Sequence, residues 1–479
     1  MSRKRTIKFY LITILSALAL GLVSACSNPE VRSPLARTGC RVCHKVDIDP
    51  PHDIGCTTCH RGNEAAKTIK GAHQGLIARP SGPGRMAEVC GRCHKDEVAS
   101  AEASAHFTLR DEIGALWGAF FPEDRTPSIK DFANMGPPGT ERGIVADLLR
   151  RRCLLCHVYY EGDDYAGVRR GTGCAACHLP IKARACLKDR IDHRFKRQVS
   201  DENCLACHYG NFVGWDYYGR FEKDFEDDFR APLVKGRHIP RPYGVEWHDM
   251  TPDVHKRYGM PCTACHIKGP CQKGTHDKEE GTHDKEGGTK TISCIECHST
   301  GGEGKGMPMD PGIIGHRKGD LGRVSCDACH ALWGFYDKGR SLVLQESPIF
   351  DDWTYLAVQG SSEIEKAVTD HNSGKTDTIT MTDKFTGQAR LGLWFQVFSE
   401  RRWWPVVLGE DRDGRLRVMR PLLDISISYV NARGDVVFDN LRPKGQPLIP
   451  YTPHTIGRAD LQRTIFVGKW LEEDRADKK

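Results

Sequence analysis

One five-residue pattern constrains this chain more than any other feature, because Cys-x-x-Cys-His occurs nine times between Cys40 and His330. Two thiols at this spacing can form thioethers with the two vinyl groups on one porphyrin edge, and the adjacent histidine then lies beneath the iron. We therefore predict nine covalently attached c-type haems (haem c), each bound by two cysteines and one proximal histidine. The nine copies are Cys40/Cys43/His44, Cys56/Cys59/His60, Cys90/Cys93/His94, Cys153/Cys156/His157, Cys174/Cys177/His178, Cys204/Cys207/His208, Cys262/Cys265/His266, Cys294/Cys297/His298 and Cys326/Cys329/His330.

A single copy of this motif would also suit a zinc half-site or a redox-active Cys-x-x-Cys pair. Nine copies, each followed by histidine, argue strongly against both alternatives. The motifs use 18 of the 21 cysteines and leave only Cys26, Cys186 and Cys271. For Cys186 and Cys271 two states stay open, a disulfide between them or a free thiol near the haems.

The density of motifs predicts the fold class. From Cys40 to His330 there are 291 residues for nine motifs, or about 32 residues per haem, which is too little polypeptide to give each haem its own core. The haems must share walls and pack against one another. We therefore expect a mostly irregular and α-helical multihaem cytochrome c with low secondary-structure content, followed by a carboxy-terminal antiparallel β domain.

The motifs fall into three groups of three, at 40–94, 153–208 and 262–330, within a predicted haem domain of residues 26–335. In the first spacer, 111–121 is apolar enough for a helix, whereas 122–143 holds clustered Pro and Gly and is expected to be a loop. After residue 335 the cysteines stop and β-rich runs begin, so residues 336–479 are predicted to be a β domain that ends in a helix over 459–473. The expected strands cover 341–345, 354–358, 377–382, 391–398, 416–419 and 424–430.

The amino terminus predicts export. A basic start is followed by an apolar run, 9–23, that is shorter than a membrane-spanning helix requires. The run ends in Val23-Ser24-Ala25-Cys26, which resembles a bacterial lipobox and makes residues 1–25 a lipoprotein signal peptide. By that resemblance Cys26 is lipidated, and Ser27 after it favours sorting to the outer membrane. An ordinary cleaved signal peptide is the alternative.

The formal charge of +6 does not indicate a nucleic-acid-binding protein. Each haem would add two propionates, or roughly eighteen negative charges against about nine positive ones from oxidised iron. We therefore expect a mildly acidic holoprotein and no nucleic-acid partner.

The histidine count favours bis-histidine ligation. Nine of the 21 histidines are proximal, which leaves twelve for at most nine distal positions. Of these, His371 lies in a polar stretch and is the weakest candidate. His276 and His283 belong to a tandem repeat at 274–287 that is typical of a surface loop, with metal binding or haem ligation as alternatives. The predicted distal iron ligands are His52, His73, His106, His193, His238, His248, His255, His316 and His454.

The nine motifs and the lipobox, over residues 26–330, resemble multihaem c-type cytochromes of metal- and oxyanion-respiring bacteria. The segment 247–266, WHDMTPDVHKRYGMPCTACH, is similar to distal-histidine segments of octahaem tetrathionate-reductase-like cytochromes. Residues 404–440 and the run Pro453-His-Thr-Ile456 look like the tail of lipoprotein cytochromes encoded with selenite and tellurite reduction systems. The resemblance implies electron transfer at the cell envelope in anaerobic respiration. There is no Cys-x-x-Cys-Lys, so the lysine-ligated haem of ammonia-forming nitrite reductases is not indicated.

We therefore predict an electron-transfer lipoprotein, at the periplasmic or cell-surface face of the outer membrane, that carries electrons to a metal or oxyanion reduction pathway. Expected partners are other multihaem cytochromes, quinol-linked donors or an outer-membrane conduit, and no catalytic residue is assigned. The alternative is a terminal reductase of selenite, tellurite, tetrathionate or nitrite with one haem open on its distal side. The basic runs 150–152 and 169–170 would then attract the oxyanion, unless they form a solvated face or pair with propionates.

Overall fold

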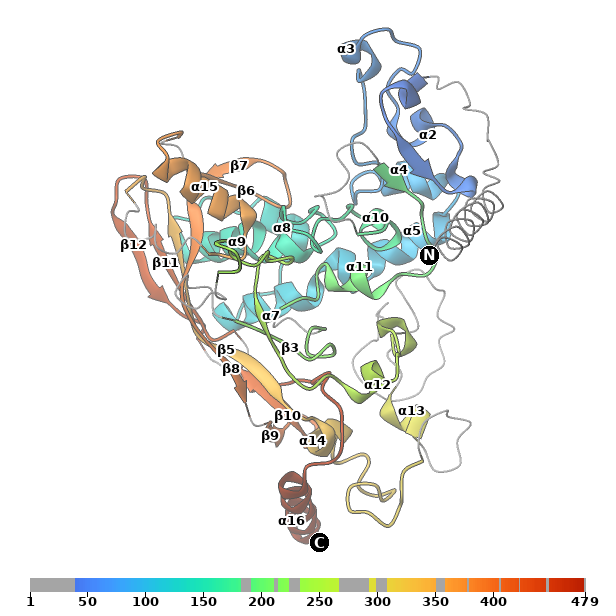
Figure 1. The fold of residues 1–479 in the computed structure, drawn as a ribbon. Coiled ribbons are helices and arrows are strands. Elements are labelled where there is room, and N and C mark those ends of the chain that lie inside the picture. The colour runs from blue at the N-terminus through green and yellow to red at the C-terminus, as the bar shows by residue number, and fades with distance from the viewer. Residues whose placement is uncertain are drawn as a thin grey trace, which may run out of the picture.

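The computed structural model describes residues 39–181, 191–210, 214–223, 233–266, 293–298, 308–349, 358–376, 379–404, 406–421, 423–444 and 448–477. Figure 1 shows a projecting amino-terminal arm, a central helical body and a sheet on the opposite side, with α16 (Leu461–Asp477) at the base. The predicted signal peptide, Cys26, Cys186, Cys271 and the tandem repeat lie outside the described residues. No helix in the described ranges is both long and apolar enough to cross a membrane.

The arm holds the first two motifs and is joined to the body by a small sheet. Strand β1 (Val46–Ile48) pairs in parallel with β2 (Ile191–His193), a segment far along the chain. The other elements of the arm are one or two turns long: η1 (Gly39–Val42), η2 (Pro50–His52), α2 (Cys56–His60) and α3 (Ile69–Ala72).

The body consists of short helices and turns, as the motif density predicts. Its longest helices are α7 (Arg110–Phe120) and α9 (Glu141–Arg151). The others up to the third motif group are α4 (Met86–Val89), η3 (Cys90–Arg92), α5 (Lys95–Ala103), α6 (Ala105–Thr108), α8 (Ile129–Ala133), η4 (Cys153–Cys156), α10 (Cys174–His178) and α11 (Asp201–Leu205). The remainder comprises β3 (Arg220–Glu222), β4 (Trp247–Asp249), α12 (Val254–Arg257), η7 (Cys262–Ala264), α13 (Cys294–His298) and α14 (Cys326–His330).

Two predictions for the first spacer have different outcomes. The helix expected over 111–121 is α7, which buries Ile113, Leu116 and Trp117. The loop expected over 122–143 is interrupted by α8 and overlaps the start of α9, so that prediction is wrong for 129–133 and 141–143. Ser128 begins α8 with a capping box, in which its hydroxyl accepts from Asp131 N and its own N–H donates to the Asp131 carboxylate. This pattern is a helix start that outweighs the surrounding Pro and Gly residues.

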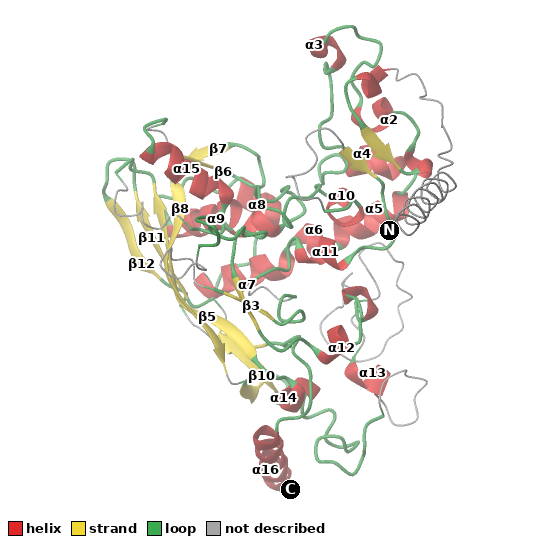
Figure 2. Ribbon diagram, viewed as in Figure 1, coloured by secondary structure: helices red, strands yellow, loops and turns green. Residues whose placement is uncertain are grey.

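The carboxy-terminal strands form a four-stranded sheet in the order β12-β11-β5-β8 (Figure 2). Most pairs are antiparallel, as predicted, but β5 (Gly334–Gln345) and β11 (Ile425–Val430) run parallel, so the sheet is mixed. The other strands are β6 (Thr380–Thr382), β7 (Ala389–Leu391), β8 (Leu393–Trp404), β9 (Val407–Glu410), β10 (Leu416–Pro421), β12 (Val436–Leu441) and β13 (Leu448–Pro450), and α15 (Ser362–Asn372) precedes β6. The terminal helix expected over 459–473 is α16. The strand expected over 354–358 lies mostly outside the described residues.

The largest hydrophobic core spans the boundary predicted at residue 335. Side chains of α7, α8 and α9, including Phe120 and Leu149, pack in one cluster with Leu344, Trp394 and Ile427 of the sheet. A buried hydrogen bond from Trp394 Nε1 to Asp147 Oδ1, 2.8 Å long, reinforces this contact. The sheet therefore buries its face on the helices beside the fourth motif.

Candidate haem sites

Each motif folds so that its three haem-binding side chains share one face. In α2, α10, α13 and α14 the helical turn covers the five motif residues themselves, and four other motifs begin with a 3-10 turn. The backbone N–H of His44, for example, donates to Cys40 O at 3.0 Å. Positions i, i+3 and i+4 of a helical turn lie side by side, which directs both thiols and the imidazole toward one porphyrin.

The motif cysteines differ in exposure. Cys43 and Cys93, the second cysteines of the first and third motifs, are exposed, whereas the second cysteines of the other seven motifs are partly buried. The backbone N–H groups of Cys43 and Cys93 still donate to the first cysteine of the same motif, at 3.3 and 3.1 Å, which keeps each thiol on the motif turn. Cys177 is half-buried in α10, but it is Cys174, the first cysteine of that motif, that hydrogen-bonds to Cys90 of a neighbouring motif. Haem attachment through each of the motif cysteines stays a prediction from spacing.

Seven motif histidines each face one non-motif histidine, with ring centroids 5.9 to 6.4 Å apart. Two imidazoles on one iron, with metal–nitrogen bonds of about 2 Å and roughly 1 Å from nitrogen to ring centre, have centroids about 6 Å apart. The residues present therefore fit a bis-histidine haem at each of these positions. The pairs are His44–His73, His94–His52, His60–His193, His208–His106, His298–His255, His266–His454 and His330–His316.

Carboxylates orient several of the non-motif histidines. Asp253 Oδ1 lies 2.8 Å from His255 Nδ1, and this hydrogen bond raises the pKa of His255. Asp49 Oδ2 lies 2.5 Å from His52 Nδ1. A carboxylate on Nδ1 fixes the tautomer and turns Nε2 toward the facing imidazole, as the outer partners of metal-bound histidines do.

Backbone carbonyls orient three of the motif histidines in the same way. Nδ1 of His60, His178 and His330 lies 2.8 to 2.9 Å from a carbonyl oxygen of Ile77, Lys196 and Gly457, respectively. Nδ1–H donates to the carbonyl, so Nε2 stays available for iron.

His454 reaches its site across the chain because a buried carboxylate holds its segment. Asp216 is fully buried, and its Oδ2 accepts from His454 N at 2.9 Å and from the Tyr451 hydroxyl at 2.8 Å. Its Oδ1 accepts from two backbone N–H groups near the sixth motif. The segment that follows β13 is thereby fixed against the helical body, with His454 facing His266.

Contacts between motif cysteines give the order in which the sites adjoin. The thiols stand here for thioether sulfurs on porphyrin edges, so two thiols in contact bring two porphyrin edges together. Cys204 and Cys262 hydrogen-bond, which lowers the pKa of Cys204 and raises that of Cys262. The same kind of contact joins Cys40 with Cys56, Cys90 with Cys174, and Cys294 with Cys326.

Three further pairs of cysteines lie close enough for charge to raise a pKa, in addition to the larger effect of burial: Cys59 with Cys90, Cys156 with Cys207, and Cys265 with Cys297. Asn203 Nδ2 joins the fifth and sixth motifs by donating to Ala176 O and Leu179 O. The motifs thus form a continuous row in the order one, two, three, five, six, seven, eight, nine. The fourth motif lies beside this row, next to the fifth and sixth.

The fourth motif is arranged differently from the paired ones. His157 Nε2 lies 2.5 Å from Glu112 Oε2, a carboxylate in the first turn of α7. Nearby, the Arg170 guanidinium donates to Leu155 O, His157 O and Ala206 O and ties this motif to the sixth. The sequence analysis did not identify Glu112, because one acidic residue at a helix start carries no distinguishing pattern.

Among the described residues, no second histidine ring contacts His157 or His178. Two predicted distal ligands are not brought to a motif histidine: His238 is exposed, and the ring of exposed His248 stacks on Phe221. His371 lies in α15, away from the motifs in sequence. His276 and His283 lie outside the described residues.

The arginines of the first basic run help to hold the fold together. Arg150 and Arg151 are fully buried, so they do not form a solvated face. Arg151 pairs with Asp147 at 3.2 Å and donates to Leu391 O at 3.0 Å, while Arg150 lies 3.6 Å from Asp383. These guanidiniums therefore hold α9 against the sheet.

The second basic run is also used inside the protein. Arg169 pairs with Glu161, and Arg170 uses both terminal nitrogens on backbone carbonyls. In the first run, Arg152 donates from Nη2 to Gln359 O, and its buried Nη1 has no hydrogen-bond partner in the described part of the chain.

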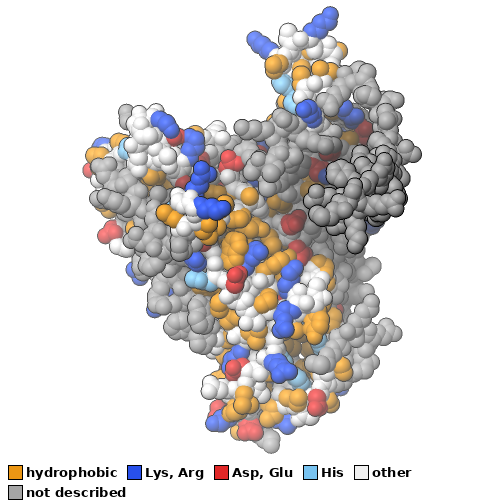
Figure 3. Space-filling model, viewed as in Figure 1, with side chains coloured by type: hydrophobic (Ala, Val, Ile, Leu, Met, Phe, Trp, Pro, Cys, Tyr) orange, Lys and Arg blue, Asp and Glu red, His pale blue; other side chains and the backbone are white. Residues whose placement is uncertain are grey.

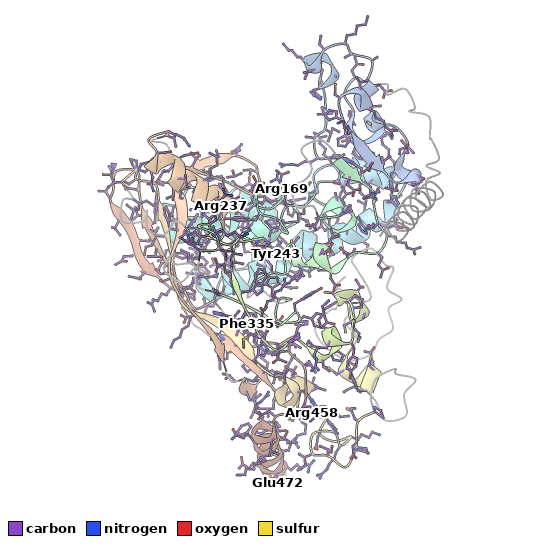
Figure 4. All side chains as sticks on the ribbon, viewed as in Figure 1. Arg169, Arg237, Tyr243, Phe335, Arg458 and Glu472 are labelled. Carbon is purple, nitrogen blue, oxygen red and sulfur yellow. The ribbon has the colours of Figure 1, made fainter. Side chains whose placement is uncertain are left out.

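One face of the molecule carries a broad hydrophobic area. Figure 3 shows hydrophobic side chains gathered across the middle of the visible face, where the helical body meets the sheet. Tyr243, labelled in Figure 4, belongs to an aromatic cluster with Tyr209 and Trp215 beside the sixth motif. Flat apolar rings of this kind suit the faces and edges of a porphyrin.

Comparisons with known protein families, with curated proteins and with solved structures found no match to this chain. In the described ranges no three His, Cys, Asp or Glu side chains converge as a metal-ion site. A bis-histidine haem takes only two protein ligands from such residues.

Proposed function

We propose that this protein is a multihaem c-type cytochrome that relays electrons through nine covalently bound haems, mostly with two histidine ligands. Haem c, when bound, supplies a one-electron iron couple at each site. The observation that carries the proposal is the pairing of seven motif histidines with seven non-motif histidines at the spacing of two ligands on one iron. Zinc half-sites would have no need for this pairing.

The chain's own residues explain how electrons would pass from haem to haem and why the haem reduction potentials would be low. Cysteine contacts between successive motifs hold porphyrin edges together along the row, and the paired imidazoles leave no position for substrate. Histidine pairs, with carboxylates or carbonyls on Nδ1, make strongly donating ligands that favour oxidised iron. Potentials in the paired sites are therefore expected to be low. Lipidation at Cys26 would hold the relay at the outer membrane, where it would exchange electrons with other multihaem cytochromes, quinol-linked donors or an outer-membrane conduit.

The direct test is reoxidation of the purified, fully reduced protein. Mixing with selenite, tellurite or a soluble ferric chelate is expected to reoxidise every haem, because each site adjoins another. The measurement is stopped-flow absorbance in the haem α band. A protein without bound haem, or one in which most haems stay reduced, would overturn the proposal.

A further inference from the structure

The amino-terminal arm ends in the short helix α3, which Figure 1 shows projecting beyond the body, at the end of the molecule opposite α16. The described residues also begin in this arm, at Gly39. A Cβ placed on Gly39 would lie 3.3 Å from the Cβ of Glu64, in the segment that leads into α3. The start of the described chain is therefore in contact with the segment that forms the end of the arm.

The outer part of the arm is cationic. Residues 65–87 contain four Lys or Arg and no Asp or Glu, and Figure 3 shows Lys and Arg side chains at the end of the arm. Two of these cations form ion pairs with carboxylates, Arg79 with Glu161 and Arg85 with Glu88. Lys67 and Lys70 are exposed, and neither forms an ion pair with a carboxylate in the described ranges. Two unpaired cations on a projecting element favour an anionic partner.

An apolar side chain lies between the two lysines in the sequence and is open to solvent. Ile69 is 75% exposed, and its carbonyl oxygen accepts from His73 N at 3.1 Å, so the two residues lie on one side of α3. The His73 ring faces the first motif. Lys67, Ile69 and Lys70 together form the arm tip, which leads directly into the first haem site. Lysines around an exposed apolar side chain are typical of surfaces that lie on a bilayer.

The proposed lipid anchor is close to the arm along the chain. Cys26 precedes Gly39 by only 13 residues, and an extended chain of that length spans at most about 45 Å. A tether this short raises the local concentration of lipid headgroups at the arm to about the millimolar range, so even a weak contact is populated. The anchor would therefore deliver the arm to the bilayer.

We propose that the arm tip is a membrane-contact surface, at which Lys67 and Lys70 bind the phosphates of anionic lipid headgroups and Ile69 enters the interface. This inference rests on the proposed function, specifically on its lipid anchor at Cys26. The first haem site then lies at the bilayer surface, where a membrane-bound donor can reach it. The ninth site, where Asp460 N at the start of α16 donates to Cys329 O, lies at the other end of the row.

The first experiment measures vesicle binding by the holoprotein without its lipid, made by replacing residues 1–26 with an ordinary export signal that is cleaved before Ser27. The protein is expected to sediment with vesicles of phosphatidylcholine and phosphatidylglycerol in equal parts, and to bind little to phosphatidylcholine alone. Binding should weaken as salt rises, because the Debye length falls from about 10 Å at 0.1 M to about 3 Å at 1 M. Tryptophan absorbance measures the protein in the pellet, and intact mass measures its haem content.

Substitutions at the arm tip identify the surface. Lys67→Glu/Lys70→Glu should weaken binding to the anionic vesicles about tenfold, because both cations near the headgroups are reversed. The matched control Lys318→Glu/Lys469→Glu makes the same change in charge at exposed residues at the other end of the molecule and should bind like the wild type. Ile69→Ser should weaken binding severalfold and leave its salt dependence unchanged, because it removes apolar area and no charge.

A wild type that binds neither kind of vesicle would overturn the proposal, as would equal binding by the two charge-reversal variants. Lys67 and Lys70 that pair only with propionates of the first haem would give a charge-reversal variant that binds like the wild type, which also overturns it. So would Ile69→Ser that binds as tightly as the wild type. A protein without haem that still binds the anionic vesicles would overturn the relay and leave this surface standing.

The second experiment locates the contact in the intact lipoprotein. Backbone amides of residues 64–76 should exchange hydrogen more slowly when the lipidated holoprotein is in anionic vesicles than when it is in neutral ones, because the contact protects them. Amides of α16 should exchange at the same rate in both. An unchanged rate in residues 64–76, or protection of α16 instead, would overturn the proposal, because another face would then lie on the membrane.

Discussion

The seventh and fourth motifs adjoin the same neighbour, the sixth, yet their histidines face different groups. His266 faces the imidazole of His454, which a buried carboxylate holds in place. His157 faces Glu112, which is partly exposed and belongs to the first turn of a helix. The difference shows how a histidine far along the chain is brought to a motif: a buried carboxylate, Asp216, fixes its segment at the seventh motif. At the fourth motif the facing group is instead a carboxylate that solvent can reach.

Removing the haem of the fourth site in one variant, and that of the seventh site in another, is expected to give the largest difference between the two sites. The double variant Cys153→Ala/Cys156→Ala is expected to leave the row continuous and the reoxidation of the remaining haems unchanged. Cys262→Ala/Cys265→Ala should interrupt the row and slow reoxidation of part of the haems severalfold. Stopped-flow reoxidation measures the difference, with intact mass as the check that one haem is lost. Identical behaviour of the two variants would contradict the distinction between row and branch.

Changing the second imidazole of the seventh site should shift its potential. His454→Met is expected to raise the potential of one haem by on the order of 0.1 V, since the axial ligand sets haem potential over a range of about 0.8 V. Spectroelectrochemical titration measures the shift. His238→Met, at an exposed histidine that faces no motif histidine in the described structure, is the matched control and should change nothing. An unchanged titration curve for His454→Met would mean that His454 is not a ligand.

Removing the carboxylate from a ligand histidine should have a smaller effect. Asp253→Asn removes the negative charge beside His255 Nδ1. The reduction potential of the haem at the eighth site is therefore expected to rise by on the order of tens of millivolts. Asp253 also accepts from His255 N at the start of α12, and its loss should destabilise the protein by about 1 kcal/mol. Redox titration and thermal unfolding separate the effects. A fall in potential would contradict the role assigned to Asp253.

The sheet contact should affect stability but not the sites. Trp394→Phe removes the hydrogen bond to Asp147 in the buried core and is expected to lower the free energy of unfolding by about 1 to 3 kcal/mol. The haem spectrum should stay that of the wild type, because the lost hydrogen bond joins Trp394 to Asp147 and to no residue of a haem motif. Denaturant unfolding measures the loss, and a changed spin state would show that the sheet and the fourth site are coupled.

The haem motifs and the choice among histidines could be predicted from sequence to a large degree. The motif positions follow from covalent spacing, and His52, His255 and His316 were expected because they lie a few residues before a motif. His454 was also predicted, but the sequence did not show what places it, since Asp216, whose carboxylate accepts from its backbone N–H, lies more than 200 residues earlier.

Other features depend on packing that the sequence does not reveal. The parallel pairing of β5 with β11 and the shared core with α7 and α9 arise from long-range contacts. The basic run at 150–152 suggested an anion site, but Arg150 and Arg151 are buried against Asp147 and Asp383. Glu112 was missed because its role depends on the element it faces, not on its neighbours in sequence.

Spacing also does not reveal how deeply each sulfur is enclosed. The pentapeptide is the same at every motif, yet Cys43 and Cys93 are exposed whereas Cys156 and Cys207 are only partly accessible and lie near each other.

The central claim is tested most directly by the intact mass and the low-temperature electron paramagnetic resonance spectrum of the purified, oxidised protein, measured on the same sample. The account predicts the mass increments of nine covalently bound haems and low-spin, bis-histidine signals from at least seven of them, matching the paired histidines. A colourless protein without those increments, or a spectrum dominated by high-spin iron, would contradict it.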